Sequence, residues 1–321
     1  MQLGKFFFEK PVFLAPMAGV TDKAFRQVVR AVGGHYVWTE MISDKALLYS
    51  NPRTLNMLNL EGEASPKIVQ LFGSDPGHMA QAAQIAEQMG ADIIDINMGC
   101  PTPKIVKNGE GAALLRDLGR AESIAAAVVK AVKLPVSVKM RLGWDAGKIV
   151  ALELGERLQG VGVQMLTLHA RTREQFYSGQ ADWNWVKRLK ARVKIPVIGN
   201  GDIDSLEAAK FRQESSGCDG IMVGRGALGN PWLLPRIAHY LRSGELLPEP
   251  SVIEKIRIAS LHFELLLEFK GERIGLNEMR KHAAWYVKGL KHAGQLRDAI
   301  MSTKSPEEMK LILEQILENQ A

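Results

Sequence analysis

Polar residues recur at or near the ends of a series of short apolar segments, and their types could bind a cofactor and move protons. In chain order they are Gln70, Asn97, Lys139, Arg141, His169, Arg171, Asn200, Asp202 and Arg225. A structural hydrogen bond would explain any one of them, since a buried polar side chain needs a partner. Six of the eight apolar segments carry such residues at the same end, where the first segment ends in Pro16, Met17, Ala18 and Gly19. Unrelated structural roles would not produce that alignment. The pattern therefore predicts one shared site.

Two glycine-rich segments, IGNGD at 198–202 and VGRGALG at 223–229, follow the last two apolar segments. Glycine-rich turns expose backbone N–H groups, which together with the guanidinium of Arg225 suit a phosphate dianion. Three glycines of the second segment also match the G-x-G-x-x-G pattern of dinucleotide-binding folds. The acidic residue expected about 20 positions later would be Glu245, which lies in a polar connector and on no expected strand. A phosphate site is favoured over a dinucleotide-binding fold.

The side chains of Lys139 and Gln70 indicate which cofactor the phosphate would belong to. A reduced flavin gains negative charge around N1 and the C2 carbonyl, so a fixed ammonium group stabilises it, and an amide can pair with the polar edge of the ring. A structural ion pair is the alternative for Lys139, because a lysine inside an apolar strand is costly without a partner.

The two cysteines, Cys100 and Cys218, have different contexts. Cys100 directly follows an expected strand, at the end where the polar residues gather. A thiol is mostly protonated at neutral pH and can donate a proton and recover it from solvent; a small buried side chain is the alternative. Cys218 precedes the last strand, at the opposite end, and is expected in the core. Their spacing suits neither a disulfide framework nor a thiolate metal site.

These residues need strands and helices that bring them together. Eight strand-length segments are expected at 12–17, 36–40, 68–72, 93–97, 136–141, 165–169, 197–200 and 220–223. Segments with helical spacing lie at 22–32, 76–89, 121–132, 146–158, 182–191 and 205–213. This alternation predicts an α/β fold, a closed (β/α)8 TIM barrel, with an open doubly wound sheet as the alternative. In a barrel the C-terminal strand ends meet at one face, where the polar residues would form one site.

A polar segment with two prolines, SGELLPEPS, follows the last βα unit and is typical of a connector between domains. Three helical segments are expected beyond it, at 252–269, 277–292 and 306–318. The last of them has Ser305 as its N-cap candidate, with Glu308 three residues on. We therefore expect three parts, a barrel domain at 1–242, a connector at 243–251 and a C-terminal helical-bundle domain at 252–321.

The chain of 321 residues has a formal net charge of +6, which mildly favours a polyanionic partner. The segment from Arg280 to Arg297 contains no acidic residue and interleaves basic with aromatic side chains, as RNA binding requires. A solvated helix face is the alternative. The loop after Cys100 carries Lys104 and Lys107 among glycines, so it could be a gate or a plain solvated loop.

The composition, 46% hydrophobic and 24% charged, excludes a disordered chain. No window of the sequence approaches the roughly 18 apolar residues of a membrane span, and the start lacks a secretory signal. We expect a cytoplasmic protein that enters no membrane and holds no metal.

Taken together, these motifs resemble one known family, the FMN-dependent tRNA-dihydrouridine synthases, most closely the bacterial B-type. The resemblance spans nearly the whole chain and rests on seven segments in order: APMAGVTD at 15–22, QLFGSDP at 70–76, DINMGCP at 95–101, KMRLGW at 139–144, LHARTREQFYSG at 168–179, IGNGDI at 198–203 and MVGRGALGNPW at 222–232.

The resemblance implies roles for the matched residues. FMN would be held by Pro16, Met17, Ala18, Gln70, Lys139, His169, Asn200, Gly201, Asp202, Gly224 and Arg225. Cys100 would be the catalytic proton donor, and the target uracil would be held by Asn97, Arg141 and Tyr177. Contacts with tRNA are expected from Arg171, Arg173, Lys104, Lys107, Arg280, Lys281, Lys288 and Lys291.

The implied activity is an oxidoreductase reaction on a D-loop uridine of tRNA, expected at position 17, by a monomer. NADPH, or NADH, would reduce the flavin in a separate half-reaction. Reduction of the uracil C5–C6 bond needs a hydride at C6, from flavin N5, and a proton at C5, from Cys100. One alternative is an FMN barrel acting on a small molecule, as dihydroorotate dehydrogenases do, which leaves the basic tail unexplained. Another is a non-catalytic RNA-binding protein on a barrel scaffold.

Overall fold

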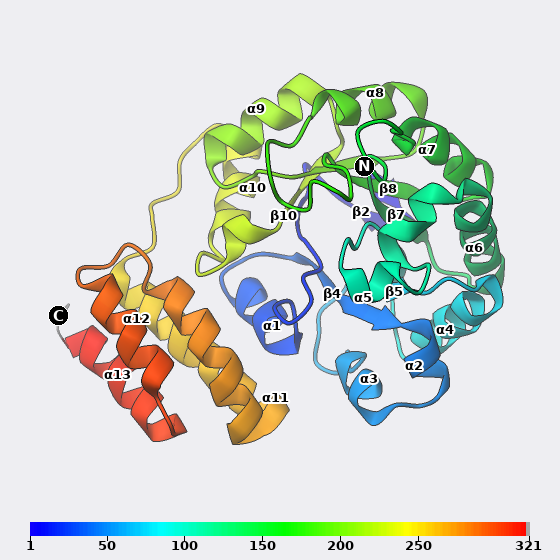
Figure 1. Cartoon of the computed structure of the whole chain (residues 1–321). Helices are drawn as coiled ribbons and strands as arrows, with labels where there is room; N and C mark the ends of the chain where they lie inside the picture. The colour runs from blue at the N-terminus through cyan, green and yellow to red at the C-terminus, as the bar shows by residue number, and fades with distance from the viewer. Residues whose placement is uncertain (319–321) are drawn as a thin grey trace.

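The computed structural model describes residues 1–318, and its centre is a closed barrel of eight parallel strands (Figure 1). These strands are β3 (Val12–Leu14), β4 (Tyr36–Ser43), β5 (Ile68–Phe72), β6 (Ile93–Met98), β7 (Val136–Arg141), β8 (Met165–His169), β9 (Val197–Asn200) and β10 (Gly220–Val223). Neighbouring strands pair in chain order, and β10 pairs in parallel with β3, which closes the barrel. The predicted TIM barrel is confirmed, and the open sheet is wrong.

Inward side chains of the barrel form two layers of different character, because side chains alternate between the two faces of a strand. The layer near the N-terminal strand ends is apolar and includes Phe13, Trp38, Ile68, Ile93, Met165, Ile198 and Met222. Two positions further along the strands, the layer turns polar, with Gln70, Asp95, Thr167 and Asn200. The same alternation therefore builds a dry floor and a polar mouth.

A short hairpin of β1 (Gln2–Leu3) and β2 (Phe6–Phe7), which the sequence did not predict, lies at the N-terminal end of the barrel. The ring of Phe8, directly after it, lies 5.7 Å from that of Phe13 and 4.9 Å from that of Tyr36. Because Phe8 is buried against the apolar floor, it seals this end, and access to the interior is from the opposite end.

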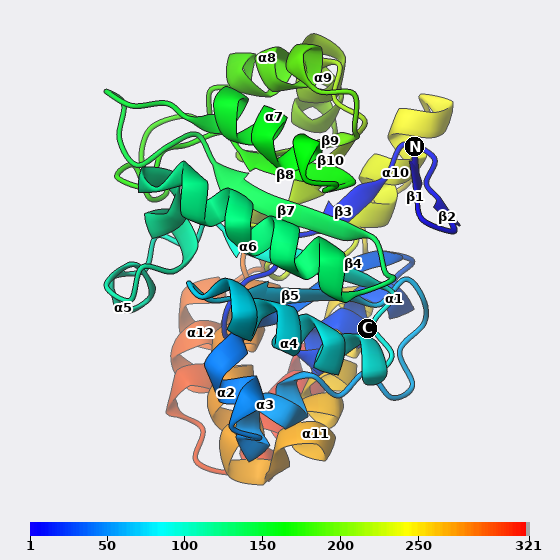
Figure 2. The same ribbon diagram turned by 90° about the vertical axis from the view of Figure 1, so that its right-hand side faces the viewer.

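Helices surround the barrel (Figures 1 and 2). The main ones are α1 (Lys23–Ala31), α4 (Pro76–Gln88), α6 (Leu118–Ala131), α7 (Ala151–Gly160), α8 (Asn184–Arg192), α9 (Leu206–Ser216) and α10 (Leu233–Ser243). Shorter elements lie in the loops and were not predicted: α2 (Asp44–Leu48), α3 (Pro52–Met57), α5 (Pro103–Val106), and the 3-10 turns η1 (Gly111–Arg116) and η2 (Arg225–Ala227).

The predicted start of one helix, residue 146, is wrong, since α7 begins at Ala151. The preceding residues form a turn in which the carbonyl oxygen of Leu142 accepts bonds from the N–H groups of Val150 (2.9 Å) and Ala151 (3.0 Å). A side chain at Gly143 would come within 2.2 Å of the carbonyl oxygen of Lys148. The turn therefore depends on close contact between two backbone segments, and the spacing of apolar residues does not predict such a contact.

Beyond α10, which includes Ser243, residues 244–251 contain neither helix nor strand. Three C-terminal helices follow, α11 (Val252–Tyr286), α12 (Ala293–Ser302) and α13 (Pro306–Glu318). The long α11 contains a break at Gly271 (φ 73°, ψ 167°), between the two segments that the sequence predicted. The predicted end of the second segment at residue 292 is wrong, because the helix ends at Tyr286. His292, with φ 60°, is the N-cap of the next helix, α12.

The C-terminal helices pack against α1 of the barrel, beside which they lie in Figure 1. Ala24 of α1 belongs to their core, and the ring of Phe25 lies 5.5 Å from that of His262 and 5.6 Å from that of His282. Both histidines are buried. The α11 helix is therefore joined to the barrel by a packed interface. Within residues 1–318, no helix has both the length and the apolar character needed to cross a membrane.

Candidate active site

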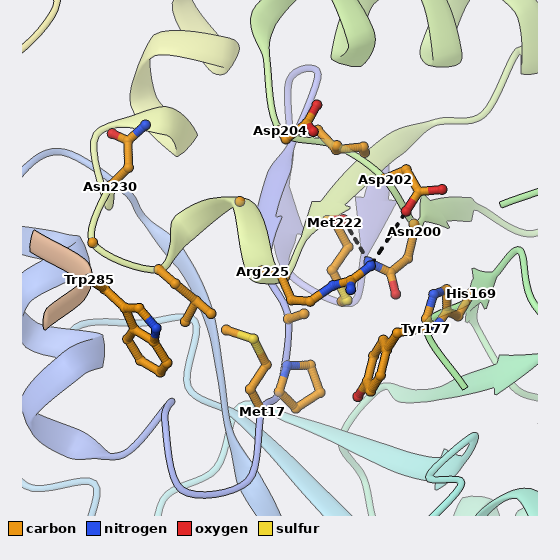
Figure 3. A pocket seen from close by; sticks show the side chains of 18 of the residues that line it. Met17, His169, Tyr177, Asn200, Asp202, Asp204, Met222, Arg225, Asn230 and Trp285 are labelled. Atoms are coloured by element: carbon orange, nitrogen blue, oxygen red, sulfur yellow. Dashed lines mark hydrogen bonds and ion pairs between the residues drawn. The ribbon is translucent and has the colours of Figure 1, made fainter. Parts of the chain in front are cut away.

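A pocket of about 640 Å³ lies at the C-terminal ends of the strands (Figure 3). Its volume lies within the range of about 300–1,000 Å³ that small-molecule sites occupy. Among its lining residues are most of those predicted for the cofactor, together with Tyr177: Pro16, Met17, Lys139, His169, Asn200, Gly201, Asp202, Gly224 and Arg225. The structure thus brings together residues from five strands or the loops after them. The sequence predicted this, because the polar residues recur at the same end of each strand.

The pocket is electropositive. Its lining contains five cationic side chains, Lys139, Arg171, Arg225, Lys255 and Lys288, against the two carboxylates of Asp202 and Asp204. Burial holds the pKa of His169 well below its usual value, and four neighbouring cations add to this: Lys139, Arg141, Arg171 and Arg225. The imidazole is therefore neutral at physiological pH.

Lys139 presents its ammonium group to the pocket from β7. The Nζ atom donates to Oδ1 of Asn200 at 3.2 Å, and Nδ2 of Asn200 donates to the carbonyl oxygen of Met222 at 2.8 Å. Burial, together with the charge of Arg141, lowers the pKa of Lys139 to about 8. Its partner in the structure is an amide, so the charge is available to an anionic ligand.

The loop after β9 carries Asp202 in the left-handed backbone region, with φ 51°, next to Gly201, with φ 124°. The Asp202 carboxylate accepts bonds from the guanidinium of Arg171 at 2.7 Å and from the N–H of Ala181 at 2.8 Å. Arg225 lies 3.6 Å from the same carboxylate. Burial alone would raise the pKa of Asp202, but the bonds from Ala181 and Arg171 lower it below its usual value. The carboxylate of Asp202 thus links the Gly-rich loop after β9 to the Gly-rich loop after β10.

Arg171, expected to contact tRNA, is 1% exposed. Besides Asp202, its guanidinium donates to the carbonyl oxygens of Ser178 at 3.1 Å and Gly179 at 2.7 Å. A side chain so enclosed has no surface to offer an RNA backbone. The structure corrects that expectation, and Arg171 braces the loops around the pocket instead.

Gln70 lies deeper than the flavin assignment implied. It is fully buried, its Nε2 donates to Oδ2 of Asp95 at 2.6 Å, and its Oε1 accepts from Nδ2 of Asn97 at 2.8 Å. Asp95 also accepts from Oγ of Ser137 at 2.5 Å. Both polar atoms of the Gln70 amide are engaged, so in this structure Gln70 supports the site through Asn97.

Asp95 was missed as a site residue, although the polar–apolar alternation of DINM already placed it inward. It is fully buried, and burial raises its pKa to about 6, while Gln70, Ser137 and the charge of Lys139 oppose the rise. Its place between Gln70 and Ser137 makes it the anchor of the polar layer under the pocket.

Cys100 lies just after β6, half-buried, beside the pocket and not among its lining residues. The Oδ1 atom of Asn97 accepts from the backbone N–H groups of Cys100 at 2.9 Å and Gly99 at 3.1 Å. The thiol donates to Oγ1 of Thr102 at 3.3 Å. The loop is thus held by its backbone, which leaves the sulfur at the mouth. Cys218 is buried, as predicted.

Arg141 and Tyr177 flank the same mouth. The Arg141 guanidinium is 2% exposed and donates to the carbonyl oxygens of Gly99 (2.9 Å), Thr172 (2.8 Å) and Phe176 (2.7 Å). The Tyr177 ring is 52% exposed and lies 5.6 Å from the Arg141 guanidinium and 4.8 Å from that of Arg225. Tyr177 is therefore accessible to a substrate, whereas Arg141 shapes the loops that carry Cys100 and Tyr177.

The other expected tRNA contacts fall into two groups. Lys104, Lys107, Lys288 and Lys291 are exposed. The rest make contacts within the protein: Arg280 donates to the carbonyl oxygen of Thr303, Lys281 donates to that of Gly19, and Arg173 stacks over the rings of Trp144 and Phe176. Only the first group presents free charge to a partner.

Sequence reasoning missed the contribution of α11 to the pocket. Lys255, Trp285 and Tyr286 line it, and Figure 3 shows Trp285 on the side away from His169 and Tyr177. A side chain at Gly229, where φ is 69°, would come within 2.3 Å of the backbone oxygen of Trp285. The glycine at this position therefore permits the loop after β10 to contact the backbone of α11 directly. Within the described residues, no cluster of His, Cys, Asp and Glu could hold a metal ion.

A sequence model of the dihydrouridine synthase (Dus) family matches residues 13–321. This chain belongs to the dihydrouridine synthase family. A probable tRNA-dihydrouridine synthase of Rickettsia bellii is 43% identical over 311 residues, covering 97% of this chain and 95% of the relative. tRNA-dihydrouridine synthase B of Vibrio cholerae is 40% identical over 321 residues and is covered completely. The family predicted from the motifs is confirmed, and this dihydrouridine synthase is an enzyme.

Solved structures share the barrel of this dihydrouridine synthase. 6-Hydroxypseudooxynicotine amine oxidase from Pseudomonas geniculata N1 has a TM-score of 0.58, and histamine dehydrogenase from Rhizobium sp. 4-9 has one of 0.57, each at 14% identity. The matches cover 75% and 83% of this chain, which spans about half of each of those chains, 49% and 50%. At this identity the likeness supports the fold alone.

Proposed function

We propose that this dihydrouridine synthase binds FMN in the pocket and reduces a uridine of tRNA, with NADPH or NADH as the reductant. The observation that carries the proposal is the excess of positive charge around His169, at a barrel mouth whose last two loops are rich in glycine. A pocket of this volume and charge fits a phosphorylated ligand that becomes anionic on reduction.

The residues present fit FMN in chemical type. Lys139 and Asn200 offer an ammonium group and an amide for the polar edge of the ring system, and Pro16 and Met17 offer an apolar wall. The glycine-rich loops at 201–202 and 224–226 offer backbone N–H groups, with Arg225 as the cation for the phosphate. His169, held neutral, adds a hydrogen-bonding ring without further charge.

FMN held in this pocket and reduced by NADPH or NADH would supply the hydride that C6 of the uracil requires. Cys100 donates the proton to C5, so that the ring gains one hydrogen at each carbon, and the thiolate then recovers a proton from solvent. Asn97 supports this role because it holds the backbone of Cys100, and Arg141 supports it through the carbonyl of Gly99. The exposed ring of Tyr177 provides a surface for the uracil.

The target base must leave the RNA stack to reach a barrel mouth, which costs a few kcal/mol and less in a loop than in a helix. The exposed lysines at 104 and 107, in and after α5, and at 288 and 291, beyond the end of α11, offer contacts for RNA phosphates. We propose a D-loop uridine, position 17, as the target, and a cytoplasmic monomer as the working form.

Two measurements test this function. Purified protein should carry a flavin absorbance spectrum that NADPH bleaches; a protein that neither contains nor takes up FMN contradicts the proposal, and a bleachable flavin excludes a non-catalytic RNA-binding role. Mapping of dihydrouridine in tRNA from a strain lacking the gene should show one D-loop position left as uridine. If the flavin is present and every dihydrouridine persists, a small-molecule substrate is favoured instead.

A further inference from the structure

The loop at 16–22, which follows β3, is a wall of the proposed cofactor pocket, because Pro16 and Met17 line it. Its own hydrogen bonds form a tight turn: the N–H groups of Val20 and Thr21 both donate to the carbonyl oxygen of Met17 at 3.0 Å, and the N–H of Met17 donates to Oγ1 of Thr21 at 2.9 Å. Because these bonds join Met17 to the far side of the turn, the position of the turn's apex determines the position of Met17.

Gly19 is the apex, with φ 70° and an exposed backbone. Both of its backbone polar groups have side-chain partners from other parts of the fold. Its N–H donates to Oε1 of Glu40, at the mouth end of β4, and its carbonyl oxygen accepts from Nζ of Lys281, on α11. An exposed loop is thus held from two sides, once by the barrel and once by the C-terminal helices.

Further contacts attach the same loop to α11. Lys270 makes ion pairs with Asp22, at the end of the loop, and with Glu278. Asp22 also caps α1 by accepting from the N–H of Phe25 at 2.9 Å. The Nζ of Lys281 additionally lies 5.7 Å from the ring centre of Trp285, which lines the pocket. One ammonium group therefore bonds the loop that carries Pro16 and Met17 and lies over the ring of Trp285, and all three of these residues line the pocket.

We infer that Lys281 is a positioning residue for the cofactor site: through the Gly19 carbonyl and the Trp285 ring, it sets the wall against which FMN binds. This inference rests on the proposed FMN binding. It also reassigns Lys281, which the sequence placed among the tRNA contacts. A hydrogen bond from a charged donor is among the stronger ones in proteins, and here it holds the exposed apex of the loop from the side of α11.

The test compares full-length Lys281→Met with Arg273→Met, a control that removes a charge from an exposed position on the same helix. FMN is removed from each protein, and its dissociation constant is measured by quenching of flavin fluorescence. We expect Lys281→Met to weaken FMN binding about fivefold or more, and Arg273→Met to bind as the wild type does. Lys281→Arg, which keeps a cationic donor, should restore most of the affinity.

Binding of tRNA provides the readout that separates positioning from RNA contact. In the FMN-saturated protein, Lys281→Met should keep the wild-type salt dependence of tRNA binding, because its ammonium already has a partner within the protein. FMN affinity equal to that of the wild type overturns the inference. If Lys281→Met does not fold, Lys281→Gln, which keeps an uncharged donor, permits the same comparison. Wild-type protein that takes up no FMN would instead remove the proposed function itself.

Discussion

The side-chain oxygen of Asn97 accepts a hydrogen bond from the backbone N–H of Cys100 at 2.9 Å. The other end of the same amide donates to Gln70, which is anchored by the buried Asp95. A chain of hydrogen bonds thus runs from the interior of the barrel to the loop that carries the thiol. This chain fixes the backbone of Cys100 at the mouth. The position of the sulfur therefore depends on the buried polar residues beneath it.

The first prediction concerns Cys100 itself. Cys100→Ala should retain FMN and NADPH oxidation and lose dihydrouridine formation by about a hundredfold or more, since a positioned acid contributes about 10²–10⁴-fold. The measurement is single-turnover conversion of tRNA by the prereduced enzyme. Cys218→Ala is the matched control, because this buried thiol precedes β10, at the end of the barrel opposite the mouth. Conversion by Cys100→Ala at the wild-type rate would show that another group is the acid.

A second prediction follows from the pKa of Lys139, which burial lowers to about 8. The free enzyme loses this positive charge as pH rises through 8, and the charged form is the one that attracts the anionic cofactor. We expect FMN affinity to fall about tenfold between pH 7 and pH 9, as measured by fluorescence titration. Lys139→Arg keeps its charge over this range, so its FMN affinity should change little between pH 7 and pH 9. Equal pH profiles for the two proteins would exclude Lys139 as the titrating group.

The exposed lysines of the C-terminal region give a third prediction. Replacement of Lys288 and Lys291 by Glu should weaken tRNA binding and reduce the slope of log affinity against log salt by roughly one for each lysine. As a control of equal charge change, Lys187→Glu with Lys194→Glu alters exposed positions on and after α8, on the barrel. A salt slope unchanged by the first pair would remove this surface from the tRNA footprint.

A fourth prediction concerns stability at the interface between barrel and C-terminal helices. Burial lowers the pKa of His262 to about 4, so this ring is neutral in the folded protein. In the unfolded chain it takes up a proton below about pH 6.5. The unfolded state thus binds more protons between pH 6.5 and 4, and the free energy of unfolding falls as pH is lowered through that window, by about 3 kcal/mol from this residue.

His262→Phe tests the stability prediction, because it keeps an aromatic ring against Phe25 and removes the titrating group. The variant loses the hydrogen bond between His262 and the hydroxyl of Tyr286, which is 3.4 Å long in the wild type. This loss should be the same at pH 7 and at pH 4.5. Urea unfolding at pH 7 and pH 4.5 should show a smaller loss of stability in the variant. A loss as large as that of the wild type would assign the pH dependence to other groups, such as His282.

Much of the barrel and its site was predictable because the signals are local. Strand length, the period of two along each strand and the glycine-rich turns are read over a few residues, and they placed all eight strands and the polar mouth. Helix ends were less accurate where a backbone contact intervened, as at Gly143 before α7. The break at Gly271 and the left-handed N-cap of α12 at His292 likewise depend on backbone angles that the residue pattern does not specify.

Tertiary structure alone decided which polar side chains are free to act. Arg171 and Lys281 looked like RNA contacts in the sequence, yet one is enclosed around Asp202 and the other donates to Gly19, 262 positions away. Asp95 became the anchor of the polar layer only because β5 and β7 pair with β6 on either side. Local pattern determines which way a side chain points, whereas its partner, its burial and hence its charge are determined by residues that are distant in the chain.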